Sequence, residues 1–178
     1  MTLPATLLRC ALAALLLLGR PAWADVLSDV QALLAKGDLA GALRSADSAV
    51  AARPGDAQAR FLHAVVLMDL KRNEEAMAAF TRLSQEYPEL PEPFNNLALL
   101  HVRGGRLELA RQALEAALRN DPGHRAARAN LGEVHLMLAV QAWEQAAAGG
   151  PIDPRLMRKL DAARALVAAG AAPSAAAR

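Results

Sequence analysis

The chain has 178 residues, of which 54% are apolar and 21% are charged. This balance excludes an intrinsically disordered chain, and the single cysteine excludes a disulfide-stapled scaffold. The formal net charge of +2 comes from Arg9 and Arg20 in the segment 1–24, so the remainder is formally neutral and lacks the excess of lysine and arginine with which proteins bind nucleic acids.

Residues 1–24 are typical of a secretory signal peptide. Arg9 ends a short positive region, the apolar stretch 10–18 follows, and small residues at Ala22 and Ala24 mark a cleavage site. A retained membrane anchor is the alternative, but nine apolar residues cover only about 14 Å of helix against a hydrocarbon core of about 30 Å. We therefore expect cleavage after Ala24, a mature protein without a stable membrane anchor or any cysteine, and a location in the bacterial periplasm.

Beyond this segment the composition predicts helices, and prolines divide them into units of equal length. Val, Ile and Thr, which favour strands, number only 13, while Ala and Leu dominate. Pro54, Pro88 and Pro122 are evenly spaced with a period of 34, and a turn lies near the middle of each unit. Two positions at fixed distances before each proline carry mostly small residues that we expect at the crossing of two helices: Val30, Ala64 and Ala98; Ala42, Ala76 and Ala110. A third position carries Ala46, Phe80 and Leu114, of which the bulky ones are expected to fill the space around the crossing.

This pattern resembles the tetratricopeptide repeat over residues 26–150. The third unit matches best, from the segment 91–98 (PEPFNNLA) through Gly105 and Ala110 to Pro122; the second has Lys71 in place of the usual turn glycine, and the first has Asp29 where a large apolar residue is expected. The resemblance implies an all-α fold, a right-handed superhelical α-solenoid of about three helix pairs, spanning residues 25–168.

The fourth unit departs from the pattern. The segment 123–148 contains no breaker at its midpoint, and Glu144 stands where a small crossing residue would lie, so we expect one long helix there. A final helix over 155–167 has one apolar stripe and is predicted to cap the solenoid. Residues 169–178 are predicted to be a disordered tail.

The resemblance further implies a concave groove that binds a peptide, lined by the first helix of every unit. The residues that we place in this groove are Phe61, Val65, Met68, Asn95, Asn96, Leu99, Arg103, Asn130, Glu133 and Met137, with Leu27, Gln31 and Leu34 at its start in the first repeat. Asn96 and Asn130 share one repeat position, at which related repeats carry an asparagine that bonds the backbone of a bound peptide. The alternative is that these amides bridge neighbouring helices. A clamp for a peptide carboxylate would need several cations on this face, and Arg103 alone qualifies.

Chemistry-bearing motifs are scarce in this sequence. His101 and His135 share one repeat position, which is compatible with a metal pair or a pH sensor, but an amphipathic ring that fills space between helices is the interpretation we favour. We find no phosphate-binding loop and no zinc-protease motif, and predict neither catalytic residues nor a cofactor or metal.

The sequence thus predicts a non-enzymatic periplasmic adaptor or scaffold that binds a peptide segment of another cell-envelope protein. A dedicated chaperone for one secreted client, for example in cytochrome maturation, and a non-catalytic regulatory subunit of an envelope enzyme are the alternatives.

Overall fold

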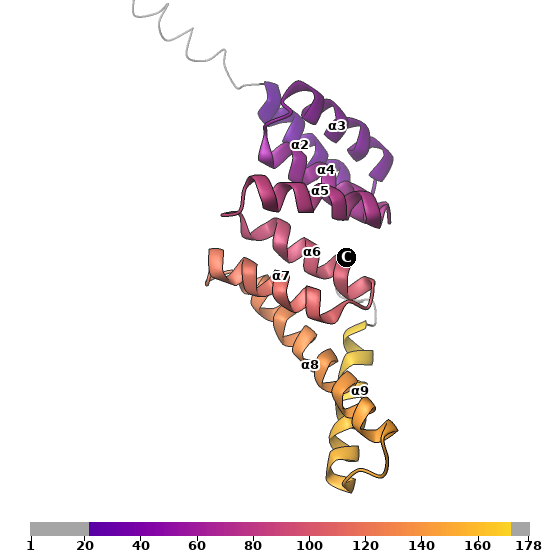
Figure 1. The fold of residues 1–178 in the computed structure, drawn as a ribbon. Coiled ribbons are helices and arrows are strands. Elements are labelled where there is room, and N and C mark those ends of the chain that lie inside the picture. The colour runs from indigo at the N-terminus through magenta and orange to yellow at the C-terminus, as the bar shows by residue number, and fades with distance from the viewer. Residues whose placement is uncertain (1–21, 172–178) are drawn as a thin grey trace, which may run out of the picture. The chain divides into compact units, whose positions relative to one another are not determined.

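The computed structural model describes residues 22–171, and this part of the chain is helical without strands (Figure 1). Its helices are α2 (Ala22–Ala35), α3 (Leu39–Ala52), α4 (Ala57–Asp69), α5 (Asn73–Glu86), α6 (Pro91–Arg103), α7 (Leu107–Asn120), α8 (Arg125–Ala148) and α9 (Pro154–Ala171). The predicted all-α class is therefore confirmed. Of the expected signal peptide only residues 22–24 are described, and they form the start of α2; the rest lies outside the described residues.

The chain divides within α5 into two compact units, residues 1–79 and 80–178, which we call unit 1 and unit 2. In unit 1, α3 packs against α2 and α4 around a core that contains Val30, Ala42 and Val66. In unit 2, α7 packs against α6 and α8 around a core that contains Ala98, Ala110 and Val134. The alanines in these cores, Ala42, Ala98 and Ala110, let helix backbones approach closely, so that short helices reach interior packing density.

The repeat period is confirmed by burial. All nine residues at the two expected crossing positions and at the position around the crossing have a relative exposure of 0%: Val30, Ala42, Ala46, Ala64, Ala76, Phe80, Ala98, Ala110 and Leu114. Gly132, the equivalent residue in the fourth repeat, is exposed, so the burial pattern ends where the fourth repeat begins. Asp29 is exposed as well and needs no partner in the core.

Each expected turn in the middle of a repeat has one residue with a backbone in the left-handed region. Gly37 has φ +75° and Gly105 has φ +68°, while Lys71 has φ +62° in the equivalent turn between α4 and α5. A left-handed backbone costs a residue with a side chain about 1–2 kcal/mol, so Lys71 is strained where the other turns use glycine.

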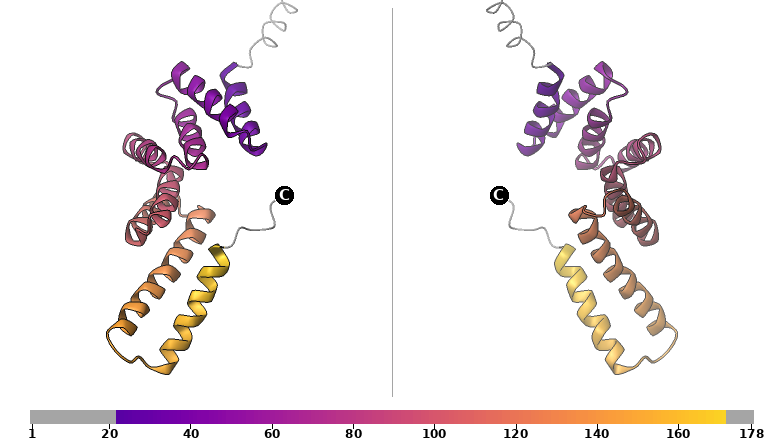
Figure 2. Two further views of the ribbon diagram at one scale, coloured as in Figure 1. Left: turned by 90° about the vertical axis from the view of Figure 1, so that its right-hand side faces the viewer. Right: turned by 90° about the vertical axis from the view of Figure 1, so that its left-hand side faces the viewer.

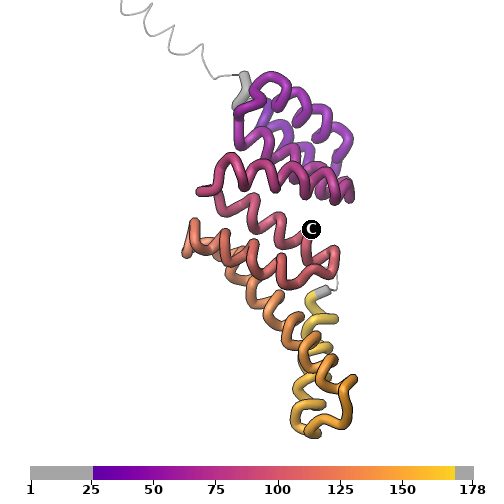
Figure 3. The backbone as a smooth tube through the Cα atoms, viewed as in Figure 1, coloured from indigo at the N-terminus to yellow at the C-terminus, as the bar shows by residue number. Residues whose placement is uncertain are grey.

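The last two helices form an antiparallel pair, as expected for a long helix and its cap (Figures 2 and 3). The 24 residues of α8 span about 36 Å, and α9 buries Leu160 and Ala163. Glu144, the misfit in the repeat pattern, accepts a hydrogen bond of 2.9 Å from Nε of Arg164 and so ties α8 to α9. The cap is longer than predicted, because α9 continues to Ala171, into the expected tail; residues 172–178 lie outside the described part.

Candidate functional site: a pocket between α6, α8 and α9

Unit 2 contains an open pocket of about 400 Å³ between the first helices of its repeats. Leu99 and Val102 of α6 form one side, and α8 forms the other. Four of the residues that the sequence places in a binding groove line this pocket: Leu99, Asn130, Glu133 and Met137. A mostly apolar cavity of this size with a few polar groups is typical of a binding site.

The third wall of the pocket was not predicted. Val167 and Gly170 of α9 line it, because the antiparallel course of α9 brings its last turns back beside the first half of α8. The apolar stripe of the cap could be recognised in the sequence, but its position in the groove could not, since α9 has no counterpart in the repeat period.

An amide pair connects α6 to α8 beside the pocket. Nδ2 of Asn130 donates a hydrogen bond of 2.9 Å to Oδ1 of Asn95, and both side chains are half-buried. This is the bridge between neighbouring helices that the sequence left open as an alternative. The bond uses one donor of Asn130 and one lone pair of Asn95, so each amide retains a further polar group.

Asn96, which shares the repeat position of Asn130, bonds within its own helix. Its Nδ2 donates to the carbonyl oxygen of Glu92, one turn earlier, at 2.9 Å. The bridge between helices thus joins Asn130 to Asn95, which occupies a different repeat position.

The remaining candidates differ in exposure. Arg103 lies in the exposed last turn of α6 and does not line the pocket, whereas Glu133 does. On α4 of unit 1, Phe61 and Val65 are half-buried, but Met68 is only 7% exposed and packs into the interior rather than forming an open groove floor.

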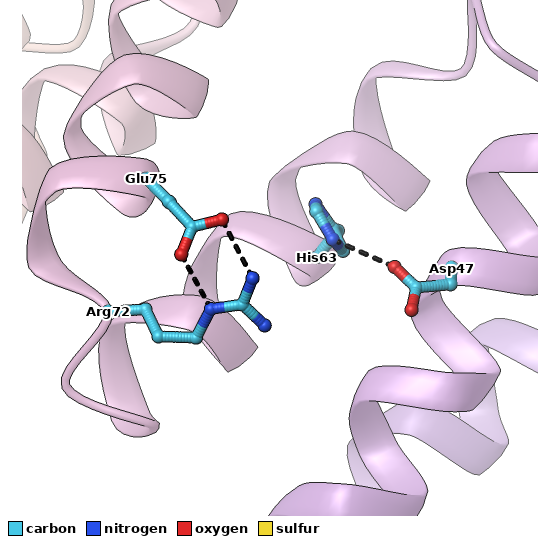
Figure 4. A network of polar contacts seen from close by, with 4 residues as sticks. All are labelled: Asp47, His63, Arg72 and Glu75. Carbon is cyan, nitrogen blue, oxygen red and sulfur yellow. Dashed lines mark hydrogen bonds and ion pairs between the residues drawn. The ribbon is translucent and has the colours of Figure 1, made fainter.

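Unit 1 carries a second pocket and a polar network. The pocket, of about 340 Å³, includes one predicted groove residue, Leu27. Its other lining residues are Val26 of α2, Ser48, Ala49 and Ala52 of α3, Ala59 of α4, and Arg53 and Asp56 between α3 and α4. In the network, Nε2 of His63 lies 3.0 Å from Oδ1 of Asp47 (Figure 4).

The other half of this network is an ion pair between Arg72 and Glu75. The guanidinium donates through Nε and Nη2 to the two carboxylate oxygens, at 2.7 Å each (Figure 4). The hydrogen bond from Arg72 lowers the pKa of Glu75, and the same bond raises the pKa of Arg72. Both side chains are exposed, so the pair contributes little to stability.

The histidines of unit 2 have separate surroundings. Nε of Arg106 donates to Nδ1 of His101 at 3.1 Å, whereas His135 is exposed. Burial, followed by the nearby Arg106 charge, lowers the pKa of His101. His124 is the N-cap of α8, since its Nδ1 accepts a hydrogen bond from the backbone N–H of Ala127 at 3.1 Å. Across residues 22–171, no group of three or more His, Cys, Asp or Glu side chains is arranged to hold a metal ion.

No helix in the described part of the chain combines the length and apolarity needed to cross a bilayer.

The fold and the pocket together define a helical-repeat protein with an open pocket between α6 and α8, which are the first helices of successive repeats. The family model for the tetratricopeptide repeat matches residues 29–91 and 95–176, so the chain belongs to the tetratricopeptide-repeat family. No curated protein matches it significantly in sequence.

Several solved structures share this fold at low sequence identity. The Sgt2 repeat domain of Aspergillus fumigatus is 17% identical, with a TM-score of 0.63 over 75% of this chain and 87% of that domain. The translocator chaperone SycD of Yersinia enterocolitica is 11% identical, with a TM-score of 0.61 over 67% and 96% of the two chains. The second repeat domain of human RPAP3, in complex with the HSP70 peptide SGPTIEEVD, is 20% identical, with a TM-score of 0.57 over 66% and 98%.

Proposed function

We propose that this protein is a non-enzymatic adaptor of the bacterial periplasm, and that it binds a peptide segment of another cell-envelope protein in the pocket of unit 2. The observation that carries the proposal is the convergence of Leu99, Asn130, Glu133 and Met137 on one open pocket. Apolar side chains there can desolvate an incoming residue, and the amide can bond a peptide backbone without reading its side chain.

The family supports this proposal in its general form. Tetratricopeptide-repeat domains are interaction modules, and the RPAP3 domain with a similar fold holds a peptide. The signal-like segment 1–24 supports the periplasmic part of the proposal, because its short apolar stretch between a charged start and a small-residue site suits export followed by cleavage.

Site-specific photocrosslinking in cells of the source organism tests the binding face. A photoreactive phenylalanine analogue replaces Leu99 or Met137 in the full-length gene, and matched variants carry it at the exposed Leu109 or Arg119 of α7. We expect the two pocket positions to capture one common envelope protein that the α7 positions do not capture. Identical adducts at all four positions would contradict the assignment of the face.

The location is tested by the mass of the same protein. Intact-mass measurement of the periplasmic fraction should show a chain that begins at Asp25. A chain that keeps Met1 and stays in the cytoplasmic fraction would refute the periplasmic part of the proposal while leaving the peptide pocket in place.

A further inference from the structure

The walls of the pocket of unit 2 carry charge of one sign only. Of the ten residues that line it, Glu133 is the only one with a charged side chain. The pocket thus presents a carboxylate without a neighbouring cation on its walls. Arg103, the one cation that the sequence places on this face, is absent from these walls.

The last turns of α9 lie beside the same carboxylate. A β-carbon at Gly170 would lie 3.7 Å from Oε2 of Glu133, and the two residues that α9 contributes to the pocket, Val167 and Gly170, carry no charge. A carboxylate at an apolar pocket without a charged partner on its walls favours a positive charge on the ligand.

We propose that the segment bound in this pocket is apolar and carries a lysine or arginine next to the side chain that enters the cavity. This inference rests on the proposed peptide-binding function and specifies the chemistry of the partner. Leu99, Val102 and Met137 receive the apolar side chain, while Glu133 receives the cation.

The same geometry disfavours the acidic ligands of the structural neighbours. The peptides held by the two RPAP3 domains, SRMEEVD and SGPTIEEVD, both end in EEVD. Placing such carboxylates against Glu133 would bring like charges together in a partly desolvated site, which opposes binding. The fold is shared with these domains, but the charge of this pocket selects the opposite chemistry.

An unbiased peptide selection tests this inference. A phage library of random dodecapeptides is selected on the immobilised full-length protein, and the most enriched sequence is synthesised with a fluorescent label. Two further peptides replace its basic residues with glutamine or with glutamate. Fluorescence anisotropy then gives the dissociation constant of each peptide at low and at high salt.

We expect enriched sequences to pair lysine or arginine with large apolar residues, and the basic peptide to bind about tenfold tighter than its glutamate version at low salt. High salt should reduce this ratio, because the exposed part of the charge interaction is screened. Glu133→Gln should reduce the ratio to about threefold or less. Glu89→Gln removes an equal charge from an exposed loop position outside the pocket and should leave the ratio unchanged.

The outcomes separate this inference from the function on which it rests. Enriched peptides that are acidic or neutral, and whose binding is lost in Met137→Glu, would overturn the charge preference and keep the peptide pocket. A preference for basic peptides that Glu133→Gln leaves intact would also overturn it. A selection that enriches no peptide sensitive to Met137→Glu would overturn the proposed function together with the inference.

Discussion

Substituting leucine for Ala110 tests whether the repeat register, rather than helix content alone, holds unit 2 together. Ala110 is 0% exposed on α7, in one core cluster with Ala98 of α6 and Leu114. Leucine adds three carbon atoms at a point where two backbones approach closely. Overpacking of this kind costs about 1–3 kcal/mol, because side chains leave their rotamers or the helices separate.

For a chain of this length, about 2 kcal/mol corresponds to a decrease in Tm of about 4–8 °C. The decrease is measured by thermal unfolding of the full-length protein, followed by circular dichroism. Ala165→Leu is the matched control, since Ala165 lies in the interior of α9 but is exposed. Equal Tm values for the two variants would refute the register.

A second variant distinguishes overpacking from a general intolerance of change. Leu114 lies one turn after Ala110 in the same cluster, so Leu114→Ala opens space close to the new side chain. Leu114→Ala alone should cost about 2–5 kcal/mol. The double variant should be less destabilised than the sum of the two single changes, because residues in contact are not additive. Strict additivity would show that the two positions do not share one packed space.

Three further predictions follow from the turns, the caps and the titratable groups. Lys71→Gly should stabilise the protein by about 1 kcal/mol in urea unfolding, because it relieves a left-handed backbone; a loss of stability would contradict the strain. Asp56→Ala should cost about 1 kcal/mol, since the carboxylate accepts hydrogen bonds from the N–H groups of Gln58 and Ala59 at the start of α4; no change would contradict its role as a cap. The pKa of His101 is lower in the folded protein than its ordinary value of 6.5, so the unfolded chain takes up a proton first as pH falls. The contribution of neutral His101 to the free energy of unfolding is therefore complete above pH 6.5 and is lost as pH falls through the folded pKa. His101→Gln should therefore reduce the decrease in the free energy of unfolding below pH 6.5, measured by urea unfolding at several pH values. The same pH dependence in the two proteins would contradict this.

The core was predictable from sequence because two physical constraints repeat together. Proline cannot continue a helix, so Pro54, Pro88 and Pro122 fix the period, and small residues are needed wherever two helices cross. Every expected crossing position is fully buried as a result. The sequence also showed that Glu144 breaks the repeat pattern in α8, but it did not identify Arg164 as the hydrogen-bond partner of Glu144.

The candidate site was predictable only where it follows the repeat. Leu99, Asn130, Glu133 and Met137 were placed on one face by the period, and they line one pocket. The bond between Asn95 and Asn130 was missed, because a contact across two neighbouring helices joins positions that the period treats as different. Met68 was placed in the groove from its spacing, yet helix position alone does not decide how deeply a neighbouring helix covers a side chain.

The position of α9 shows how a non-repeating cap can form one wall of a pocket in a repeating scaffold. The long helix α8 lacks a mid-unit turn, so no second helix of its own covers it, and α9 takes that place through Leu160, Ala163 and the ion pair of Arg164 with Glu144. Because α9 runs antiparallel to α8, covering the core also carries its end to Glu133. The helix that caps the fold thus also forms one wall of the pocket, so a ligand that uses this wall stabilises the cap by the same free energy with which the cap stabilises the complex.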